Sequence, residues 1–168
     1  GLDKVIEAFS LLPDLNINFD IVGNGSGIKF LKGVIEKHNE LSRIKILPPV
    51  PYEQVPDVIN DADLGILPFQ PWNGWNTSSP IKLFEYLSCG RPVILTTIPA
   101  HTNVLADSDC AFWVNDVTPK SFAKAIKQAI DAKTKFYKMG KEGRELVLSK
   151  YTWKAQANTI EKFLTSSD

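Results

Sequence analysis

Short apolar runs that alternate with helical patterns constrain the fold of this chain most strongly. We expect strands in the runs INFDIVG, RIKIL, LGILP, PVILT and CAFWV, at residues 17–23, 43–47, 64–68, 92–96 and 110–114. Amphipathic patterns of helical period surround them, at residues 1–12, 27–39, 52–62, 79–89, 120–132, 135–148 and 153–164. Strand–helix alternation with short connections requires parallel strands, and right-handed crossovers place helices on both faces of the sheet. The sequence therefore predicts a doubly wound, Rossmann-like α/β fold.

Length and composition predict a single domain over residues 1–168, since domains usually have ~100–200 residues. Lysine plus arginine and aspartate plus glutamate both number 19, which indicates neither a nucleic-acid partner nor an anionic membrane. Cys89 and Cys110 have neither metal-ligand spacing nor a disulfide framework, which favours a reducing compartment. The sequence contains no run of ~18 apolar residues, which a membrane-spanning helix would need. The sequence opens within a helical pattern without a preceding strand, so we interpret it as part of something longer.

In open α/β sheets, ligands bind beyond the carboxyl ends of the strands. The loops to examine therefore follow Val22, Leu47, Pro68 and Thr96. The first of them, IVGNGSG, lies between a predicted strand and a predicted helix. Its last glycine, Gly27, comes one position too early for the dinucleotide fingerprint, and no glycine stands directly before Lys29 as a P-loop requires. A glycine turn that admits a ligand at Gly23 and Gly25 and a plain tight turn remain equal alternatives.

Three further features allow both a structural and a functional interpretation. Prolines around Val50 favour a rigid loop over an edge that presents backbone groups to a flat base. Trp72 and Trp75 can stack on a sugar or a base, although packing against the protein is the commoner fate of such side chains. His101 is expected to be a loop or cap residue rather than a catalyst. Nothing in the sequence resembles a catalytic nucleophile motif, so the catalytic residues are unknown.

The segment NTSSPIKLFEYLSCGRPVI, residues 76–94, contains the most unusual predicted helix. Ser79 can cap it, Pro80 suits the first helical position, and a glycine and a proline end it. Lys82 falls in the first turn, where the helix dipole disfavours a cation by roughly 0.3–1 kcal/mol. Glu85 follows one turn later. This order of charges calls for an explanation.

Two interpretations of Lys82 and Glu85 are open. They can form a surface pair three residues apart, worth a few tenths of a kcal/mol. Alternatively, the hydroxyls and free amides of residues 77–79 bind an anion that Lys82 faces, at a helix N-terminus. Glu85 would then accept hydrogen bonds from the two hydroxyls of a ribose. The position of both residues beyond the end of a strand favours the second interpretation.

The run SSPIKLFEYLSCGRPVI resembles the nucleotide-sugar-binding segment of GT-B glycosyltransferases, in particular the large retaining group, of group 1 type, that uses UDP-, GDP- or ADP-sugars. The stretches GLDKVIEAF, FDIVGNGS, RIKILPPVPYEQVPDVINDADLGILPF and YTW stand in the same order as in the C-terminal domain of that group. The resemblance covers almost the whole chain and implies the C-terminal half of a GT-B architecture.

The resemblance implies that Glu85, at the second glutamate of the family's Glu–seven residues–Glu motif, holds the ribose hydroxyls. The first glutamate, which contacts the donor sugar in the family, is replaced here by Thr77. The turn before the helix would offer its amides to the diphosphate, and Lys82 would help to neutralise it. The loop near Val50 would meet the base, and the glycine loop would border the cleft. The nucleotide-sugar-binding residues expected on this basis are Glu85, Lys82, Thr77, Ser78, Ser79, Pro80, Ile81, Val50, Gly23 and Gly25.

The resemblance further implies a cytoplasmic glycosyltransferase of polysaccharide biosynthesis that retains the configuration of the transferred sugar. Its donor would be a nucleotide sugar, most simply a UDP- or GDP-sugar, with no cofactor and no metal. Its acceptor, a saccharide or a lipid-linked saccharide, would bind through an N-terminal domain, with association at the inner face of the membrane and no role for nucleic acid. A strand and an Arg/Lys pair would precede the first helix.

On this interpretation residues 1–168 alone transfer no sugar, because the acceptor side is missing. Two alternatives stay open. One is a GT-B sugar-nucleotide epimerase, which acts on its nucleotide sugar without a separate acceptor. The other is a non-catalytic nucleotide-binding module in which the two charged residues of the helix are structural.

Overall fold

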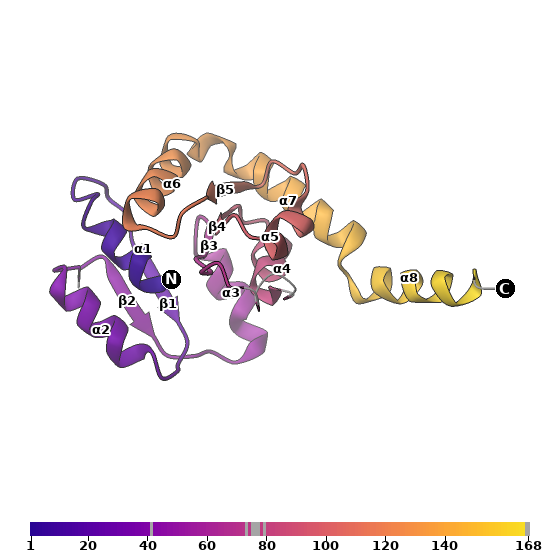
Figure 1. The fold of residues 1–168 in the computed structure, drawn as a ribbon, viewed down its shortest axis with the longest axis horizontal. Coiled ribbons are helices and arrows are strands. Elements are labelled where there is room, and N and C mark those ends of the chain that lie inside the picture. The colour runs from indigo at the N-terminus through magenta and orange to yellow at the C-terminus, as the bar shows by residue number, and fades with distance from the viewer. Residues whose placement is uncertain (41, 73, 75–77, 79, 167–168) are drawn as a thin grey trace.

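The computed structural model describes residues 1–40, 42–72, 74, 78 and 80–166, which form an α/β arrangement (Figure 1). Its strands are β1 (Phe19–Val22), β2 (Ile44–Leu47), β3 (Gly65–Leu67), β4 (Val93–Thr96) and β5 (Ala111–Val114). Its helices are α1 (Leu2–Phe9), α2 (Ile28–Lys37), α3 (Val55–Asn60), α4 (Ile81–Ser88), α5 (Pro99–Leu105), α6 (Pro119–Asp131), α7 (Phe136–Lys150) and α8 (Trp153–Thr165), with short 3₁₀ helices at Tyr52–Gln54 and Lys133–Lys135.

All the strand pairs are parallel, as predicted, but they form two hydrogen-bonded sheets rather than one. Strand β1 pairs with β2, and a separate sheet has the order β3-β4-β5. Within the described part of the chain, no ladder joins β1 to β3. The apolar pattern predicts where the strands lie, whereas pairing depends on which strands become neighbours in space. The doubly wound fold class is confirmed, and the prediction of a single sheet is corrected.

Two hydrophobic clusters cover the opposite faces of the strands. The first joins both sheets to the helices α1 and α6 and includes Ile6, Phe9, Ile44, Ile94, Val114, Phe122 and Ile126. The second lies under α4 and α7 and includes Leu67, Leu83, Leu87, Val93, Leu95 and Val147. Strand β4 shows the division most clearly, because Ile94 belongs to the first cluster and its neighbours Val93 and Leu95 belong to the second. Alternate strand residues therefore reach opposite layers of helices.

Two local predictions near the candidate site need correction. The loop predicted after β4 contains helix α5, which starts at Pro99 after an extended N-cap residue, Ile98. Proline is favoured at the first helical position, so Pro99 is a local sequence signal for this helix start. Helix α4 begins at Ile81, one residue later than expected, and Pro80 is its N-cap without a side-chain hydrogen bond. Its end is as predicted, since Gly90 follows it with a φ of +68°.

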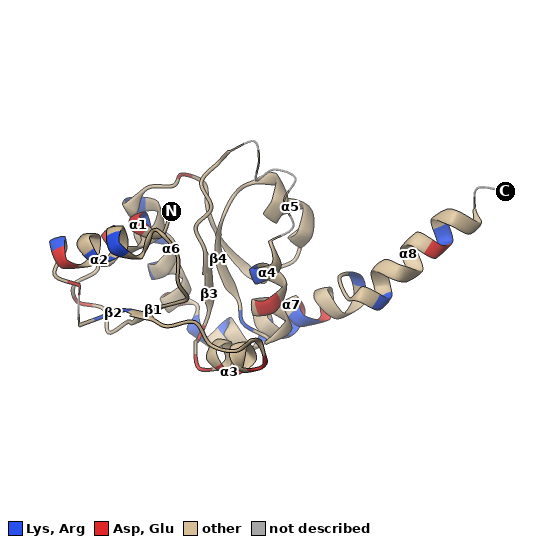
Figure 2. Cartoon of the chain, turned by 90° about the horizontal axis from the view of Figure 1, so that it is seen from below, with Lys and Arg blue, Asp and Glu red and all other residues tan. Residues whose placement is uncertain are grey.

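Helix α8 extends away from the rest of the chain, as both views show (Figures 1 and 2). The strands and the other helices lie together, whereas α8 contains no buried residue. Among the described residues, no helix is both long and apolar enough to cross a membrane.

Candidate functional site

The loops after β1 and β2 meet at the carboxyl edge of their sheet. The backbone N–H of Gly23 donates to the carbonyl of Leu47 over 3.0 Å, which holds the two loops together. Gly23 and Gly25 have φ values of +144° and +150°, and an added Cβ would meet nothing within 4 Å at either. Backbone conformation, rather than crowding, therefore requires glycine here, and the tight turn suffices to explain it. Val50 is half-buried in the following loop.

Helix α4 is anchored by its apolar face and presents its polar residues at the rim. Leu83 and Leu87 are completely buried in the second cluster. Ile81 is 68% exposed at the start of the helix. The side chain of Lys82 is 59% exposed, whereas that of Glu85 is only 16% exposed. The first turn thus faces outward, and Glu85 lies at the boundary between the core and the surface.

Lys82 and Glu85 approach each other, with the ammonium nitrogen 2.8 Å from Oε2 of the carboxylate. Oε2 is the buried oxygen of this carboxylate, so the lysine ammonium is its charged partner. Because Lys82 is largely exposed, the pair contributes about 1 kcal/mol or less. Such a weak pair does not by itself explain why the carboxylate of Glu85 is mostly buried.

Glu85 also affects the neighbouring ring of Tyr86. Burial raises the pKa of the Tyr86 phenol, and the negative charge of Glu85 raises it further. The ring lies directly on Gly65 of β3, where a Cβ would clash with it. This close contact fixes α4 against the start of β3.

The loop that leads into α4 is described only in part. Thr77, Ser79 and Trp75 lie outside the described residues, so their predicted roles stay predictions. Ser78 is half-buried, and Pro80 is buried. The indole of Trp72 lies against Gly74 but keeps 64% of its surface exposed, which is less packing than the sequence interpretation favoured.

The sequence interpretation expected His101 to be a loop or cap residue, whereas the structure buries it in a helix after β4. It lies in α5, is completely buried, and its Nδ1 stands 2.7 Å from the carbonyl oxygen of Thr96. A carbonyl only accepts, so Nδ1 carries the proton and Nε2 of the neutral ring is an acceptor. Burial lowers the pKa of His101, against the opposing effect of the Thr96 hydrogen bond. The ring of Phe69, at the start of the loop after β3, lies 5.4 Å away.

The carboxyl edge thus holds buried polar atoms that lack hydrogen-bond partners. Among the described residues, they include Oγ1 of Thr96 and Nε2 of His101. Thr96 ends β4, and His101 follows five residues later. The sequence around His101 gives no signal that the side chain is buried. The burial depends on contact with Phe69, which comes from another loop.

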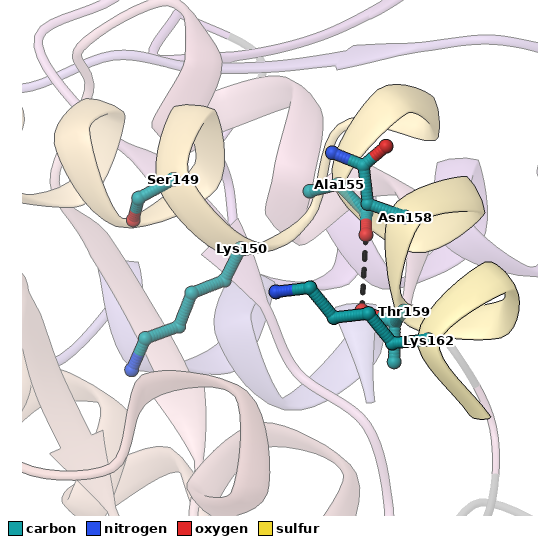
Figure 3. Close-up of a pocket in the computed structure, with 6 residues that line it drawn as sticks. All are labelled: Ser149, Lys150, Ala155, Asn158, Thr159 and Lys162. Carbon is teal, nitrogen blue, oxygen red and sulfur yellow. Dashed lines mark hydrogen bonds between the residues drawn. The ribbon is translucent and has the colours of Figure 1, made fainter. Parts of the chain in front are cut away.

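Two open hollows lie away from α4. One, of about 370 Å³, lies between α7 and α8 (Figure 3), and another, of about 300 Å³, lies beside β5 and α6. Among the described residues, no group of three or more histidine, cysteine, aspartate or glutamate side chains could hold a metal ion.

A sequence model of the family described as "Glycosyl transferases group 1" matches residues 1–146. The uncharacterized glycosyltransferase MJ1178 of Methanocaldococcus jannaschii is 21% identical over 162 residues, which cover 96% of this chain and 43% of that protein. Anabaena Alr3699/HepE, solved in complex with UDP, has a TM-score of 0.85 and 17% identity, over 99% of this chain and 45% of that one. The C-terminal domain of LpcC, a glycosyl transferase group 1 family protein from Francisella tularensis, has a TM-score of 0.76 and 17% identity, over 91% of this chain and 80% of that domain.

These likenesses support the predicted architecture. The structural neighbours are GT-B glycosyltransferases, and at such low identity they show the fold of this chain alone. The chain spans less than half the length of the full-length relatives, at 43% of MJ1178 and 45% of HepE.

Proposed function

Since the chain belongs to the group 1 glycosyl transferases, we propose that it binds the nucleotide-sugar donor in a longer enzyme that moves the sugar to an acceptor hydroxyl. The observation that carries this proposal is the carboxylate of Glu85, which is only 16% exposed and is paired with the more exposed Lys82. Both residues lie in α4, the helix that follows the carboxyl end of β3, and open α/β sheets bind ligands beyond the carboxyl ends of their strands.

Glu85 supplies what a ribose needs. An ionised carboxylate only accepts hydrogen bonds, and the two neighbouring hydroxyls of a ribose can both donate to it. Each hydrogen bond to a charged group contributes roughly 1.5–3 kcal/mol.

The start of α4 supplies positive potential for the diphosphate. The first amides of a helix have no partner within the helix, and the N-cap residue of α4, Pro80, makes no side-chain hydrogen bond to them. Lys82 is 59% exposed and can turn from Glu85 towards a bound diphosphate. Residues 77–81, with Thr77, Ser78, Ser79, Pro80 and Ile81, would line this end. The loop at Val50 and the glycine turn, Gly23 and Gly25, would border the base and the cleft.

The reaction proposed for the full protein breaks the bond between the anomeric carbon of the sugar and the diphosphate oxygen. The electron pair leaves with the diphosphate, the acceptor oxygen bonds to the anomeric carbon, and the acceptor proton passes to the diphosphate or to solvent. Cationic and dipolar groups fixed beside the leaving diphosphate stabilise its developing charge. We further propose a UDP- or GDP-sugar donor, a saccharide or lipid-linked acceptor held by the rest of the protein, and retention of configuration.

Calorimetric titration of the full-length protein with UDP, GDP and ADP tests the proposal. Glu85→Gln keeps the shape of the side chain but removes its charge, so we expect affinity for the preferred nucleotide to fall at least about tenfold. Glu145→Gln is the matched control, because Glu145 forms an exposed pair with Lys141 on α7. Its affinity should stay within about twofold of the wild type.

Three results would contradict the proposal. Equal affinities of the two variants would show that Glu85 does not touch the nucleotide. Absence of binding in a folded protein would favour a structural module. Conversion of a nucleotide sugar to its epimer without an acceptor would replace sugar transfer by epimerisation.

A further inference from the structure

His101 connects two segments that leave the carboxyl ends of neighbouring strands. Its Nδ1 donates to the carbonyl of Thr96, the last residue of β4, over 2.7 Å. The centre of its ring lies 5.4 Å from that of Phe69, with an angle of 37° between the two planes. Phe69 comes two residues after Leu67, which ends β3, and β3 pairs with β4. The imidazole therefore holds the segment after β3 to the end of β4.

The segment that starts at Phe69 leads directly into α4, the helix of Lys82 and Glu85. At its start, Phe69 is half-buried and packs against the second hydrophobic cluster. At its end, Pro80 is buried and is the N-cap of α4. Phe69 thus fixes the beginning of the chain segment that ends at the first turn of α4.

The surroundings of His101 suit only its neutral form. The side chain is completely buried, and Nδ1 carries the proton that the Thr96 carbonyl accepts. Nε2 has no hydrogen-bond partner among the described residues. Protonation would place an N–H without an acceptor, and a positive charge, in this buried position. A protonated His101 therefore has to leave it, and Phe69 would then lose the ring on which it packs.

Charged side chains close to His101 do not offset this cost. Residues 64–81, 92–106 and 111–115 contain β3, β4, β5, α5 and the segment between β3 and α4, and they include no acidic or basic side chain other than His101. The titratable side chains on the elements around them are those of Lys82, Glu85 and Tyr86 in α4 and of Tyr151 before α8. Burial lowers the pKa of His101, and the Thr96 hydrogen bond opposes it. The neutral state thus depends on burial.

We propose that His101 is a positioning residue of the donor site: its neutral imidazole holds Phe69 and, with it, the start of the segment that ends at the first turn of α4. This inference rests on the proposed function, because that turn is where the diphosphate would bind. Protonation of His101 would release Phe69 and open this segment locally, while the rest of the fold stays closed.

Hydrogen exchange of two amides in the full-length protein at pH 7.5 and 5.5, corrected for the intrinsic effect of pH, tests this role. The N–H of Leu83 donates to Pro80 over 2.8 Å in the first turn of α4, and that of Thr102 donates to Ile98 over 3.0 Å in α5. Both should exchange at least about tenfold faster than the slowest amides of α6, which indicates local opening. At pH 5.5 their protection should fall about three- to tenfold, because one released histidine changes an opening equilibrium by at most about tenfold per pH unit.

Two substitutions assign this pH response to one histidine. His101→Asn keeps a donor for the Thr96 carbonyl but cannot titrate, so its protection should differ by less than about twofold between the two pH values. His101→Gln is a second variant that cannot titrate, for use if His101→Asn does not fold. His38→Asn is the matched control, because His38 is only half-buried directly after α2, and it should respond to pH like the wild type.

A nucleotide then tests the link to the donor site. We would add, to saturation at pH 5.5, whichever of UDP, GDP and ADP binds most tightly. A ligand that binds only the closed site suppresses its opening, so the protection of Leu83 and Thr102 should rise about tenfold or more.

Four results would overturn this role of His101. A similar pH response in the wild type and His101→Asn would show that His101 does not control the opening. A response at Thr102 without one at Leu83 would confine His101 to the support of α5. Exchange of both amides at the rate of α6 would mean that the whole domain opens. A nucleotide that binds but leaves their exchange unchanged would separate this segment from the donor site. The comparison of pH values uses no nucleotide, so its failure and that of the proposed function can be told apart.

Discussion

The carboxyl edge near α4 and the projecting helix α8 are incomplete in opposite chemical senses. At the edge, side-chain atoms of Thr96 and His101 are buried without hydrogen-bond partners among the described residues. On α8, Trp153 and Leu164 are exposed without cover. A buried polar atom calls for a polar ligand or water, and exposed large apolar side chains call for an apolar surface. The difference indicates a small polar ligand at one place and an apolar contact at the other.

Both regions depend on α7, which supports α4 and leads into α8. Gly140 of α7 lies against the backbone of Gly90, just after α4, and an added Cβ would collide with the Gly90 carbonyl. Backbone cannot yield as a side chain can, so we expect Gly140→Ala to lower the free energy of unfolding by about 3 kcal/mol or more. Urea unfolding of the full-length protein measures the change.

Gly33→Ala is the matched control for this substitution. Gly33 lies in α2, and an added Cβ there would meet nothing within 4 Å. Alanine is a better helix former than glycine, so Gly33→Ala should raise the free energy of unfolding by about 0.5–1 kcal/mol. Similar changes in the free energy of unfolding for the two substitutions would contradict the close packing of α7 on Gly90.

The buried imidazole of His101 predicts that the free energy of unfolding depends on pH. Burial lowers the folded-state pKa of His101 from its ordinary value of 6.5. Below that value the unfolded chain binds a proton that the folded chain excludes, so stability is present above about pH 6.5 and is lost as pH falls towards the lowered pKa. We expect this slope in urea unfolding between pH 7.5 and 5, up to about 1.4 kcal/mol per pH unit.

His101→Gln should remove this part of the slope, whatever its effect on stability at pH 7.5. His38→Gln is the comparison, because His38 follows α2 at the surface side of the fold and is not buried. A slope that persisted in His101→Gln and disappeared in His38→Gln would show that His38, and not His101, causes the pH dependence of stability.

The smallest change in the free energy of unfolding is expected at Tyr151, between α7 and α8. Tyr151→Phe keeps the ring on Phe84 but removes the hydrogen bond to Val104, which should cost about 0.5–1.5 kcal/mol of unfolding free energy. Tyr137→Phe, at a position 86% exposed on α7, the helix that Tyr151 follows, should cost almost nothing. Equal values in urea unfolding would mean that Tyr151 does not hold the start of α8.

Local signals in the sequence predicted most elements of the fold. Gly90 ends α4, as its sequence predicts. The periodicity also predicted α8, but it could not say which surface its apolar side meets, because that depends on neighbours outside the local pattern. The division between β1 and β3 was not predictable for the same reason.

The candidate site was predictable only where its residues lie close together in the sequence. Lys82 and Glu85 were identified from their positions in one helix, and the structure brings them within 2.8 Å. The burial of His101 was missed, since it arises from α5, the end of β4 and Phe69, which only the fold brings together.

The most direct measurement of the central claim combines a change in Glu85 with a change in the ribose. Affinities of the wild type and Glu85→Gln would be determined for the preferred nucleoside diphosphate and for its 2′-deoxy form. If the carboxylate accepts the 2′-hydroxyl, the wild type should lose about tenfold or more on deoxygenation and the variant about twofold or less. An equal loss in both proteins would contradict the assignment of Glu85 to the ribose.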